Sequence, residues 1–317
     1  MEPESSVLDW LLEENNPSIR YRTLTELLGK SPDDRRVREA KAQIAASRPV
    51  TAIFSKMNPE GFWYYVDERT GRGFGDGVQY LGCVTTHFNL AFLSELGLDR
   101  SDPRVAPAVD RYLNLQQPDG DFEGHFSCLY AYNLRSFVRM GYTGDPRVRR
   151  TRELMLATDR PDGGYLCDHH EGKYATRPTK SCIRGSVKAL VAFAELPELW
   201  DSPRCRKLVS YFLRHRVCFQ TQRPTQPAAD GIAATIFPFV WRASFLEALY
   251  ALSILGYGQA PELADAWALL ETKKDEEGRY VVDWAPPRSY FKPDKRGKPS
   301  KWVTLYALLA LRHRQPT

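Results

Sequence analysis

No uninterrupted apolar run in this 317-residue sequence approaches the roughly 18 residues that a membrane-spanning helix requires. The first residues, MEPESSVLDW, are acidic and lack the basic start and apolar segment of a signal peptide. Cysteine is also scarce, because six in a chain of this length cannot form the framework of a disulfide-rich protein. We therefore expect a cytoplasmic protein without a transmembrane segment, whose cysteines bind metal or react more readily than they form bridges.

Neither sign of charge dominates, since 44 lysines and arginines face 39 acidic residues, for a net charge of +5. The densest basic run, RVRRTRE at 147–153, contains its own acid and is typical of a solvated helix face, so we expect no nucleic-acid partner. Hydrophobic residues make up 43% of the chain, as in ordinary globular proteins. We expect one folded domain over residues 1–317.

Five segments have helical apolar periodicity around most of their circumference, which predicts helices buried on nearly all sides. They are HFNLAFLSELG (87–97), YNLRSFVRMG (132–141), VKALVAFAELP (187–197), FLEALYALSILG (245–256) and WVTLYALLALRH (302–313). More polar segments that open with Pro beside Asp, Ser or Ala follow four of them. Proline is tolerated in the first turn of a helix, so these segments predict a second, amphipathic layer.

Many of the amphipathic segments run into a polar turn that contains glycine and then an aromatic residue. Examples are QQPDGDF around Gly120 and DRPDGGY around Gly163. With an N-terminal pair at 18–29 and 34–47, about five to six helix pairs can be counted. Repeats that bury their hydrophobic faces against neighbours form a solenoid or, where the curvature closes, a ring. We therefore predict an all-α fold, an α/α toroid of inner helices wrapped by outer helices.

This pattern resembles the α/α toroid of terpenoid cyclases, squalene cyclases and protein prenyltransferase β subunits. QQPDGDF resembles the cyclases' QW motif, and RGKPSKWVTLYALLAL (296–311) resembles the last helical repeat of a prenyltransferase β subunit. The resemblance covers most of residues 18–312. It implies the toroid fold and an enzyme that acts on a hydrophobic or isoprenoid-like substrate, as a transferase, lyase or cyclase.

The acidic motifs of the cyclases are missing. The sequence contains no D-x-D-D motif, and DDRRV at 33–37 lacks the third acid of a D-D-x-x-D box. Asp119 and Asp121 lie inside the QW-like turn, where we expect a structural role. The zinc ligands of prenyltransferases would include a histidine on an inner helix, but the last predicted helix offers Trp302 and Tyr306 instead. Ordinary squalene cyclization is therefore disfavoured.

Soft side chains gather near the expected starts of successive inner helices. Cys128 and Cys182 open two of these helices, and Cys167 and His169 lie in the segment between them. Neighbouring helices pack about 8 to 10 Å apart, so three thiols and an imidazole can converge on one ion. Such a donor set suits zinc, as a closed structural site or as a catalytic site with one open position. The spacing C-x-H-H-x11-C matches no standard signature, and packing of free cysteines is the competing interpretation.

We expect Asp168 or His170 to move protons beside this site, and Arg184 to orient an anionic group of the substrate. The parallel helix dipoles, together with Lys188 and Arg242 near the expected starts of two inner helices, would also favour such an anion. The connection at 220–241 is expected to fold over the mouth of the ring. The partner would then be a small hydrophobic or anionic-headed substrate, with peripheral membrane contact open. Cys83 and His87 stand one helical turn apart, as a second ligand pair, a thiol with its base, or core packing.

Two other classes of function remain open at this stage. One is a noncatalytic helical toroid used as a binding scaffold with a structural zinc. The other is a saccharide hydrolase or lyase on an α/α toroid, which we expect to need a pair of carboxylates across its cavity. No predicted inner helix shows such a pair clearly.

Overall fold

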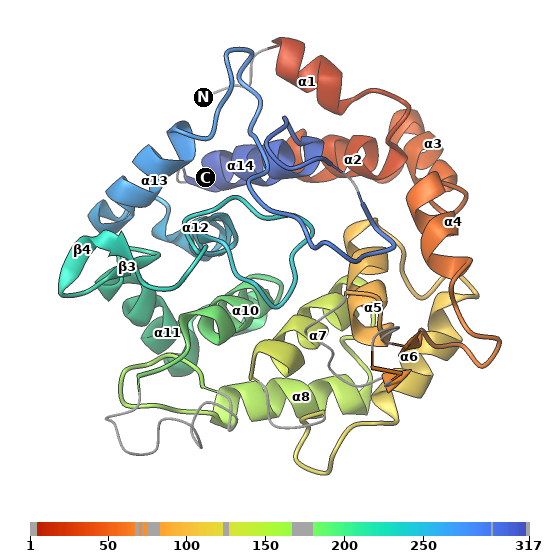
Figure 1. Cartoon of the computed structure of the whole chain (residues 1–317), viewed down its shortest axis with the longest axis horizontal. Coiled ribbons are helices and arrows are strands. Elements are labelled where there is room, and N and C mark those ends of the chain that lie inside the picture. The colour runs from red at the N-terminus through yellow and green to blue at the C-terminus, as the bar shows by residue number, and fades with distance from the viewer. Residues whose placement is uncertain are drawn as a thin grey trace.

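Two concentric layers of helices form a closed ring (Figure 1). The computed structural model describes residues 5–66, 70–71, 73–74, 83–122, 127–166, 180–292 and 294–314. The inner layer contains α2 (Pro17–Arg22) with its π-helical continuation η1 (Thr23–Leu27), α5 (Thr86–Glu95), α7 (Ser127–Arg139), α10 (Ile183–Ala194), α12 (Phe245–Leu252) with its continuation η3 (Ser253–Tyr257), and α14 (Lys301–Arg314). This ring confirms the predicted all-α toroid.

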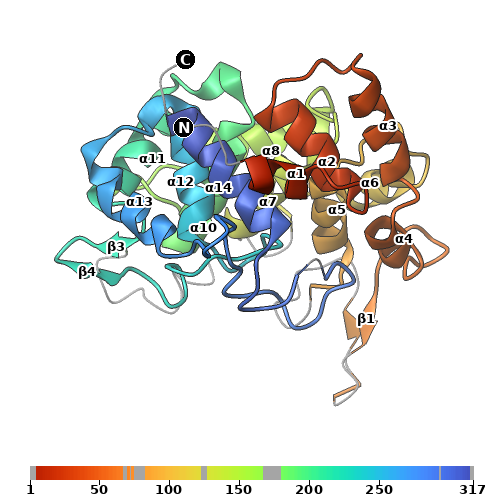
Figure 2. The same cartoon turned by 90° about the horizontal axis from the view of Figure 1, so that it is seen from above.

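The outer layer wraps these helices. It contains α1 (Ser5–Leu11), α3 (Arg35–Ile44), α4 (Arg48–Phe54), α6 (Val105–Leu113), α8 (Pro146–Ala157), α11 (Pro203–Arg214) and α13 (Ala264–Glu271), with short 3-10 turns η2 (Pro197–Leu199) and η4 (Pro261–Leu263). Two antiparallel pairs supply the strands described: β1 (Tyr65–Val66) with β2 (Gly73–Phe74), and β3 (Phe219–Gln220) with β4 (Arg223–Pro227). In Figure 2 β1 extends away from the ring.

Burial separates the two layers as the periodicity predicts. All ten residues of α5 are buried, whereas α3 buries only Val37, Ala40 and Ile44. The outer helices α8 and α11 begin with the expected caps. The Asp145 side chain accepts from the amide of Arg147 with Pro146 in the first turn of α8, and Ser202 caps α11 in the same way.

The glycine turns join each outer helix to the next repeat. In QQPDGDF the side chain of Gln116 donates to the carbonyls of Gly120 and Arg147, at 3.2 and 2.7 Å, which ties the turn to α8. The aromatic residue at the end, Phe122, is buried and stacks on Tyr112 with ring centroids 4.9 Å apart. This turn, which follows α6, is therefore held against the neighbouring outer helix α8.

The inner helices run in one direction, because residues from their C-terminal ends meet. Arg139 at the end of α7 pairs with Glu195 after α10 at 3.0 Å and with Glu26 in η1 at 3.5 Å. Glu95, the last residue of α5, accepts from Arg135 in the last turns of α7. The starts of the inner helices therefore gather at the opposite rim, as the sequence predicts.

Two long connections cover that rim. Phe237 stacks on Trp302 at the start of α14, with centroids 4.7 Å apart and planes 9° apart. The carbonyl of Phe239 accepts a 2.6 Å hydrogen bond from Tyr132 in α7. Ser289, in the connection between α13 and α14, forms a parallel bridge with Cys83 just before α5. The prediction that the segment 220–241 folds over the mouth is thus confirmed for its second half.

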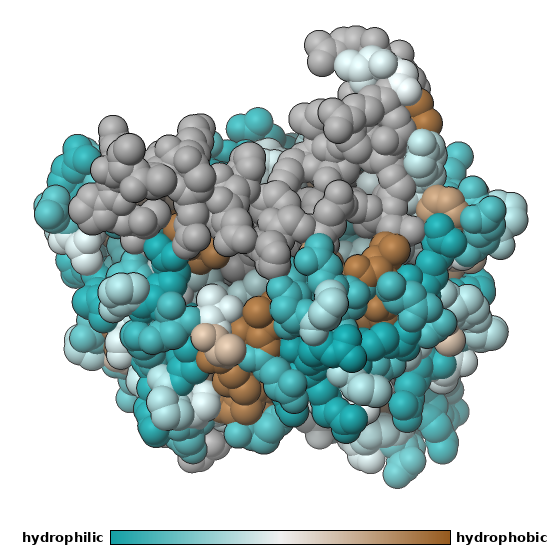
Figure 3. Space-filling view, turned by 90° about the horizontal axis from the view of Figure 1, so that it is seen from below, coloured by the Kyte–Doolittle hydropathy of each residue, from teal (hydrophilic) through white to brown (hydrophobic). Residues whose placement is uncertain are grey.

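Peripheral membrane contact stays a prediction. Within the described part of the chain, none of the helices combines the length and the apolar character needed to cross a membrane. On the face in Figure 3 the coloured residues are mainly hydrophilic, with hydrophobic ones in a few separate groups. Localisation to the cytoplasm stays a prediction.

Candidate active site

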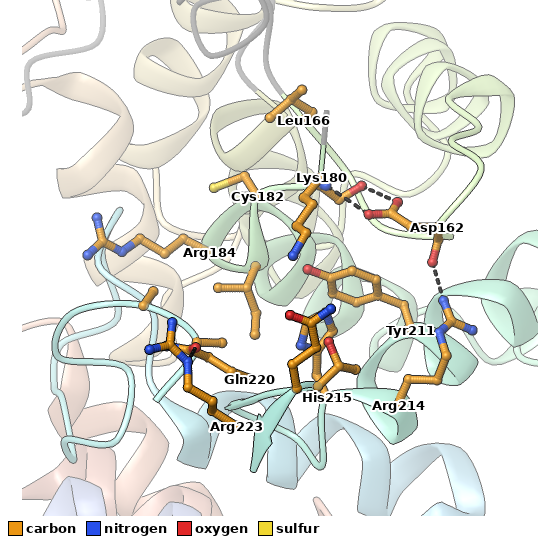
Figure 4. A pocket seen from close by; sticks show the side chains of 16 residues that line it. Asp162, Leu166, Lys180, Cys182, Arg184, Tyr211, Arg214, His215, Gln220 and Arg223 are labelled. Atoms are coloured by element: carbon orange, nitrogen blue, oxygen red, sulfur yellow. Dashed lines mark hydrogen bonds between the residues drawn. The ribbon is translucent and has the colours of Figure 1, made fainter. Parts of the chain in front are cut away.

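A pocket of about 660 Å³ opens at the rim where the inner helices start. It lies between the first turn of α10, the last turn of α11 and the β3–β4 hairpin (Figure 4). The residues that line it are Asp162, Leu166, Lys180, Ser181, Cys182, Ile183, Arg184, Tyr211, Arg214, His215, Gln220, Thr221, Gln222, Arg223, Ala228 and Ala229. Most of these residues are polar or charged, and Leu166, Ile183, Ala228 and Ala229 add apolar surface.

Positive charge prevails in the pocket. Lys180, Arg184, Arg214 and Arg223 line it, and Asp162 is the one acidic residue among the described lining residues. Because the 12-residue helix α10 starts here, the positive end of its dipole adds to the field. The pocket is therefore suited to an anionic group such as a carboxylate, sulfate or phosphate.

The carboxylate of Asp162 already accepts hydrogen bonds from neighbouring residues. Its two oxygens accept from the amide and the hydroxyl of Ser181, at 2.8 and 2.5 Å, and from the amide of Gly164. Arg214 donates to the backbone carbonyl of Asp162, as Figure 4 shows. Burial would raise the pKa of Asp162, but these hydrogen bonds outweigh it and lower that pKa. Asp162 thus shapes the pocket wall as a permanently ionised group.

Tyr211 and His215 stand one turn apart at the end of α11, with ring centroids 4.6 Å apart. The Nδ1 atom of His215 lies 2.9 Å from the carbonyl oxygen of Phe219. Burial raises the pKa of the Tyr211 hydroxyl, so this group keeps its proton and acts as a donor. The pair therefore offers a potential base and a potential acid on one wall of the pocket.

Of the sequence-predicted site residues, the structure describes Cys182 and Arg184 with their side chains, and both line the pocket. Arg184 donates to the carbonyl of Asp230 at 2.9 Å and lies 6.0 Å from the ring centre of Trp241. Cys182 precedes α10 as its cap residue and is a free thiol. The two residues are thus adjacent at the start of one inner helix, as expected.

The remaining candidates are not tested. Cys128 lies in the first turn of α7, but its side chain is outside the described residues. Cys167, Asp168, His169 and His170 also fall outside the described residues. Among those described, no group of three or more His, Cys, Asp and Glu side chains comes together as a metal site. Zinc binding stays a prediction.

The second cysteine–histidine pair belongs to the core. Cys83 and His87 are 3% and 2% exposed, and burial raises the pKa of the Cys83 thiol to about 12 and lowers that of His87 to about 3. The His87 ring packs on Phe88 with centroids 4.0 Å apart. Both side chains are therefore neutral, and of the three interpretations the core-packing one describes their surroundings.

Lys188 does not join the pocket, although its position near the start of α10 suggests that it would favour an anion there. It is fully buried, and its Nζ atom pairs with Glu247 of α12 at 2.5 Å. Toward the other rim, Glu95 accepts from Arg22 at 2.9 Å and from Tyr306 at 2.5 Å. Side chains of the inner helices thus occupy the middle of the ring.

Sequence reasoning missed several residues of the pocket: Lys180, Tyr211, His215 and Arg223. The segment that forms α11 reads as an amphipathic outer helix, and its i, i+4 spacing of Tyr211 and His215 is the one signal that could have drawn attention to it. The other residues come from connections, whose position around a pocket depends on the closed ring.

No protein-family model matches the sequence, and no curated protein matches it. Among solved structures, the chain is similar to one described as "Polysaccharide Lyase BACCELL_00875", with 14% identity over 98% of this chain and 96% of that chain and a TM-score of 0.53. It also matches the type II terpene cyclase MstE from Scytonema, with 13% identity over 86% of this chain and 97% of that chain, at a TM-score of 0.34. The first similarity extends over nearly the whole of both chains. The chain therefore shares the α/α toroid fold of that structure.

Proposed function

We propose that this protein is an enzyme that binds an anionic substrate in the basic rim pocket and removes a proton beside the anionic group. The observation that carries the proposal is the position of His215, hydrogen-bonded to the Phe219 carbonyl, in a pocket lined by four cationic side chains. We favour elimination from an acidic saccharide, the lyase form of the saccharide alternative. The similarity in fold to a polysaccharide lyase adds support.

The chemistry follows from the pocket residues. Lys180, Arg184 and Arg223 would neutralise a carboxylate, which makes the neighbouring C–H more acidic. The Nε2 atom of His215 would take that proton, and the electron pair of the C–H bond would form a C=C bond while the C–O bond to the leaving group breaks. Tyr211, which holds its proton, would donate it to the departing oxygen. Solvent then returns the proton from His215 to Tyr211.

Elimination fits this pocket better than hydrolysis. A glycosidase of the usual type needs two carboxyl groups, one of them free to act as base or nucleophile. Among the described residues of the pocket wall, Asp162 alone is acidic, and its oxygens are engaged by Ser181 and Gly164. A lyase needs a base, an acid and a cationic site instead.

The test is an elimination assay on a panel of acidic polysaccharides, followed through the ultraviolet absorbance of the C=C bond conjugated to the carboxylate. We expect turnover by the wild type, and a loss of about 100-fold or more for His215→Gln. Arg149→Ala, on the outer helix α8, is the matched control and should retain full activity. Failure of every substrate to bind or to react would overturn the proposal.

A second candidate retains the predicted zinc and an isoprenoid-like substrate with an anionic head. Cys182 lines the basic pocket as a half-exposed thiol, so an ion there would lie beside the anion site. The full donor set would be Cys128, Cys167, Cys182 and His169, a combination that suits zinc. Zinc would then act as a Lewis acid or activate a bound thiol or water, while a tightly held structural ion would fit a scaffold.

Elemental analysis of protein purified without a metal-affinity tag separates these candidates. About one zinc per chain in the wild type, lost in Cys182→Ser, would support the metal site. Ser181→Ala is the control, because it alters the neighbouring side chain without removing a thiol. Absence of zinc from the wild type would contradict the metal proposal and leave the lyase proposal untouched.

A further inference from the structure

The turn after α11 contains two residues with unusual backbone torsion angles. Arg216 and Val217 have φ values of 43° and 73°, and among the described residues they are the two non-glycine positions with positive φ. This left-handed region is unfavourable for an L-residue with a side chain, and a β-branched residue such as valine is a clear outlier there. Strain of this kind persists only where the surrounding structure fixes it, and it gathers at functional sites.

The strained turn folds the chain back onto His215. The amide of Phe219 donates to the carbonyl of His215 at 2.7 Å, and the Phe219 carbonyl lies 2.9 Å from the imidazole Nδ1. Two anchors hold the turn: Val217 is fully buried, and Arg216 pairs with Asp265 of α13 at 2.8 Å. The residue that lines the basic pocket is therefore fixed through both its backbone and its ring.

The carbonyl determines which ring nitrogen holds the proton. A carbonyl oxygen only accepts hydrogen bonds, so a neutral His215 must place its proton on Nδ1 and leave the lone pair on Nε2. Free histidine prefers the opposite tautomer. A base that acts through Nε2 needs the tautomer that the turn enforces.

We propose that the strained turn at Arg216 and Val217 is a positioning device that holds His215 as a base acting through Nε2. The catalytic role of this turn rests on the proposed function, but the expected tautomer of His215 does not depend on that function. Arg216 and Val217 act through His215 and are positioning residues.

The first test uses the wild-type protein with 15N-labelled histidine. Two-bond 15N–1H spectra distinguish the tautomers of neutral imidazole, and His215→Gln identifies the signal. We expect neutral His215 to be almost entirely protonated on Nδ1. A signal with the proton on Nε2 would overturn the proposal, whatever the activity of the enzyme.

A matched pair of variants tests the turn itself. Arg216→Asn and Arg216→Ile both remove the ion pair with Asp265, but asparagine tolerates positive φ and a β-branched side chain does not. We expect Arg216→Asn, which loses the ion pair but tolerates the positive φ, to keep more of the Nδ1 tautomer and a higher kcat than Arg216→Ile. Arg216→Ile should give a mixture of tautomers and about a tenfold lower kcat with a nearly unchanged KM. Equal tautomer ratios in the two variants would contradict the role of the turn.

A second pair of variants measures the strain at the buried Val217. Val217→Gly and Val217→Ala both remove the two γ-methyl groups of valine, but only glycine also removes the Cβ atom that makes the positive φ unfavourable. The folding equilibrium constant of Val217→Gly should exceed that of Val217→Ala by about five- to thirtyfold. Equal values would show that the turn is unstrained. If both tests of the turn succeed and no acidic saccharide reacts, the positioning stands and the proposed function falls.

Discussion

Single residues fix the turns between repeats. Gly120 adopts φ +99°, and a Cβ atom there would lie 2.5 Å from the carbonyl oxygen of Arg150 in α8. Thr151 donates to the carbonyl of Gly120 at 2.7 Å. The glycine thus allows the turn to touch the backbone of the next outer helix, which a larger residue would prevent.

Replacing Gly120 should be costly for that reason. We expect Gly120→Ala to lower the free energy of unfolding by about 2 to 4 kcal/mol, since the clash with Arg150 adds to the cost of positive φ. Denaturant unfolding measures the change. Gly144→Ala is the control, because no atom lies within 4 Å of its added Cβ, and it should change stability by less than about 0.5 kcal/mol.

Reactivity should distinguish the cysteines. Burial raises the pKa of Cys83 and Cys218 to about 12 and that of Cys205 to about 11, so all three stay protonated and covered near neutral pH. Cys182 is half-buried and lines the pocket. Alkylation of the native protein, followed by mass spectrometry, should modify Cys182 before these three. Faster labelling of any of the three would contradict their burial, and unfolded protein provides the reference rate.

At the scale of elements, inner helices are joined by buried polar contacts. Glu247 accepts from the amide of Ser244 at 3.0 Å, which completes the capping box of α12, and also pairs with Lys188 of α10. Burial raises the pKa of Glu247 although Lys188 lowers it. The Glu247 carboxylate therefore caps the start of α12 and also links α12 to α10.

Breaking this pair from one side should be expensive. We expect Glu247→Gln to lower the free energy of unfolding by about 3 to 5 kcal/mol, because Lys188 is left as a buried, uncompensated charge. The double variant Lys188→Met with Glu247→Gln should recover about 0.5 to 3 kcal/mol relative to the sum of the single changes. Glu39→Gln, in an exposed pair with Arg35, serves as control and should cost less than about 1 kcal/mol. Strict additivity would contradict the coupling.

At the scale of the whole molecule, charges from different inner helices meet inside the ring. Burial would raise the pKa of Glu95, but Arg135, Arg139 and Arg22 outweigh it and hold that pKa well below its ordinary value of 4.5. The stabilisation from Glu95 is therefore complete above the unfolded pKa and is lost as the pH falls below it. The ionised Glu95 therefore links α5 to Arg22 of α2 and to Arg135 of α7.

The buried His87 makes the folding stability depend on pH in a range above that of Glu95. Its folded pKa of about 3 lies below its ordinary value of 6.5, so between these values the unfolded chain binds a proton that the folded chain does not. Stability should therefore fall by about 1.4 kcal/mol for each unit of decreasing pH in this window. In His87→Gln this part of the slope should disappear, as measured by denaturant unfolding at about pH 6 and about pH 5. The same substitution at the half-buried His313, whose pKa burial also lowers, serves as the comparison. An unchanged slope in His87→Gln would contradict the assignment of this slope to His87.

Local patterns in the sequence are sufficient to predict the two layers of helices and the turns between them. Apolar periodicity around the full circumference distinguished inner helices such as α5 from outer ones, and glycine before an aromatic residue marked the turns at Gly120 and Gly163. These features are local, because they follow from the spacing of residues within one helix or one turn. The direction of the inner helices, and with it the common rim, followed from the regular repeat.

The set of side chains that share a pocket depends on how separate repeats pack, which the sequence does not show. His215 stands on an outer helix, Cys182 and Arg184 begin an inner one, and Arg223 belongs to a hairpin, so no local pattern links them. Lys188 shows the converse, since its place in the sequence favours the rim, whereas packing pairs it with Glu247 inside the ring. Distances between separate repeats depend on the curvature that closes the ring, and that curvature arises from the packing of all the helices together.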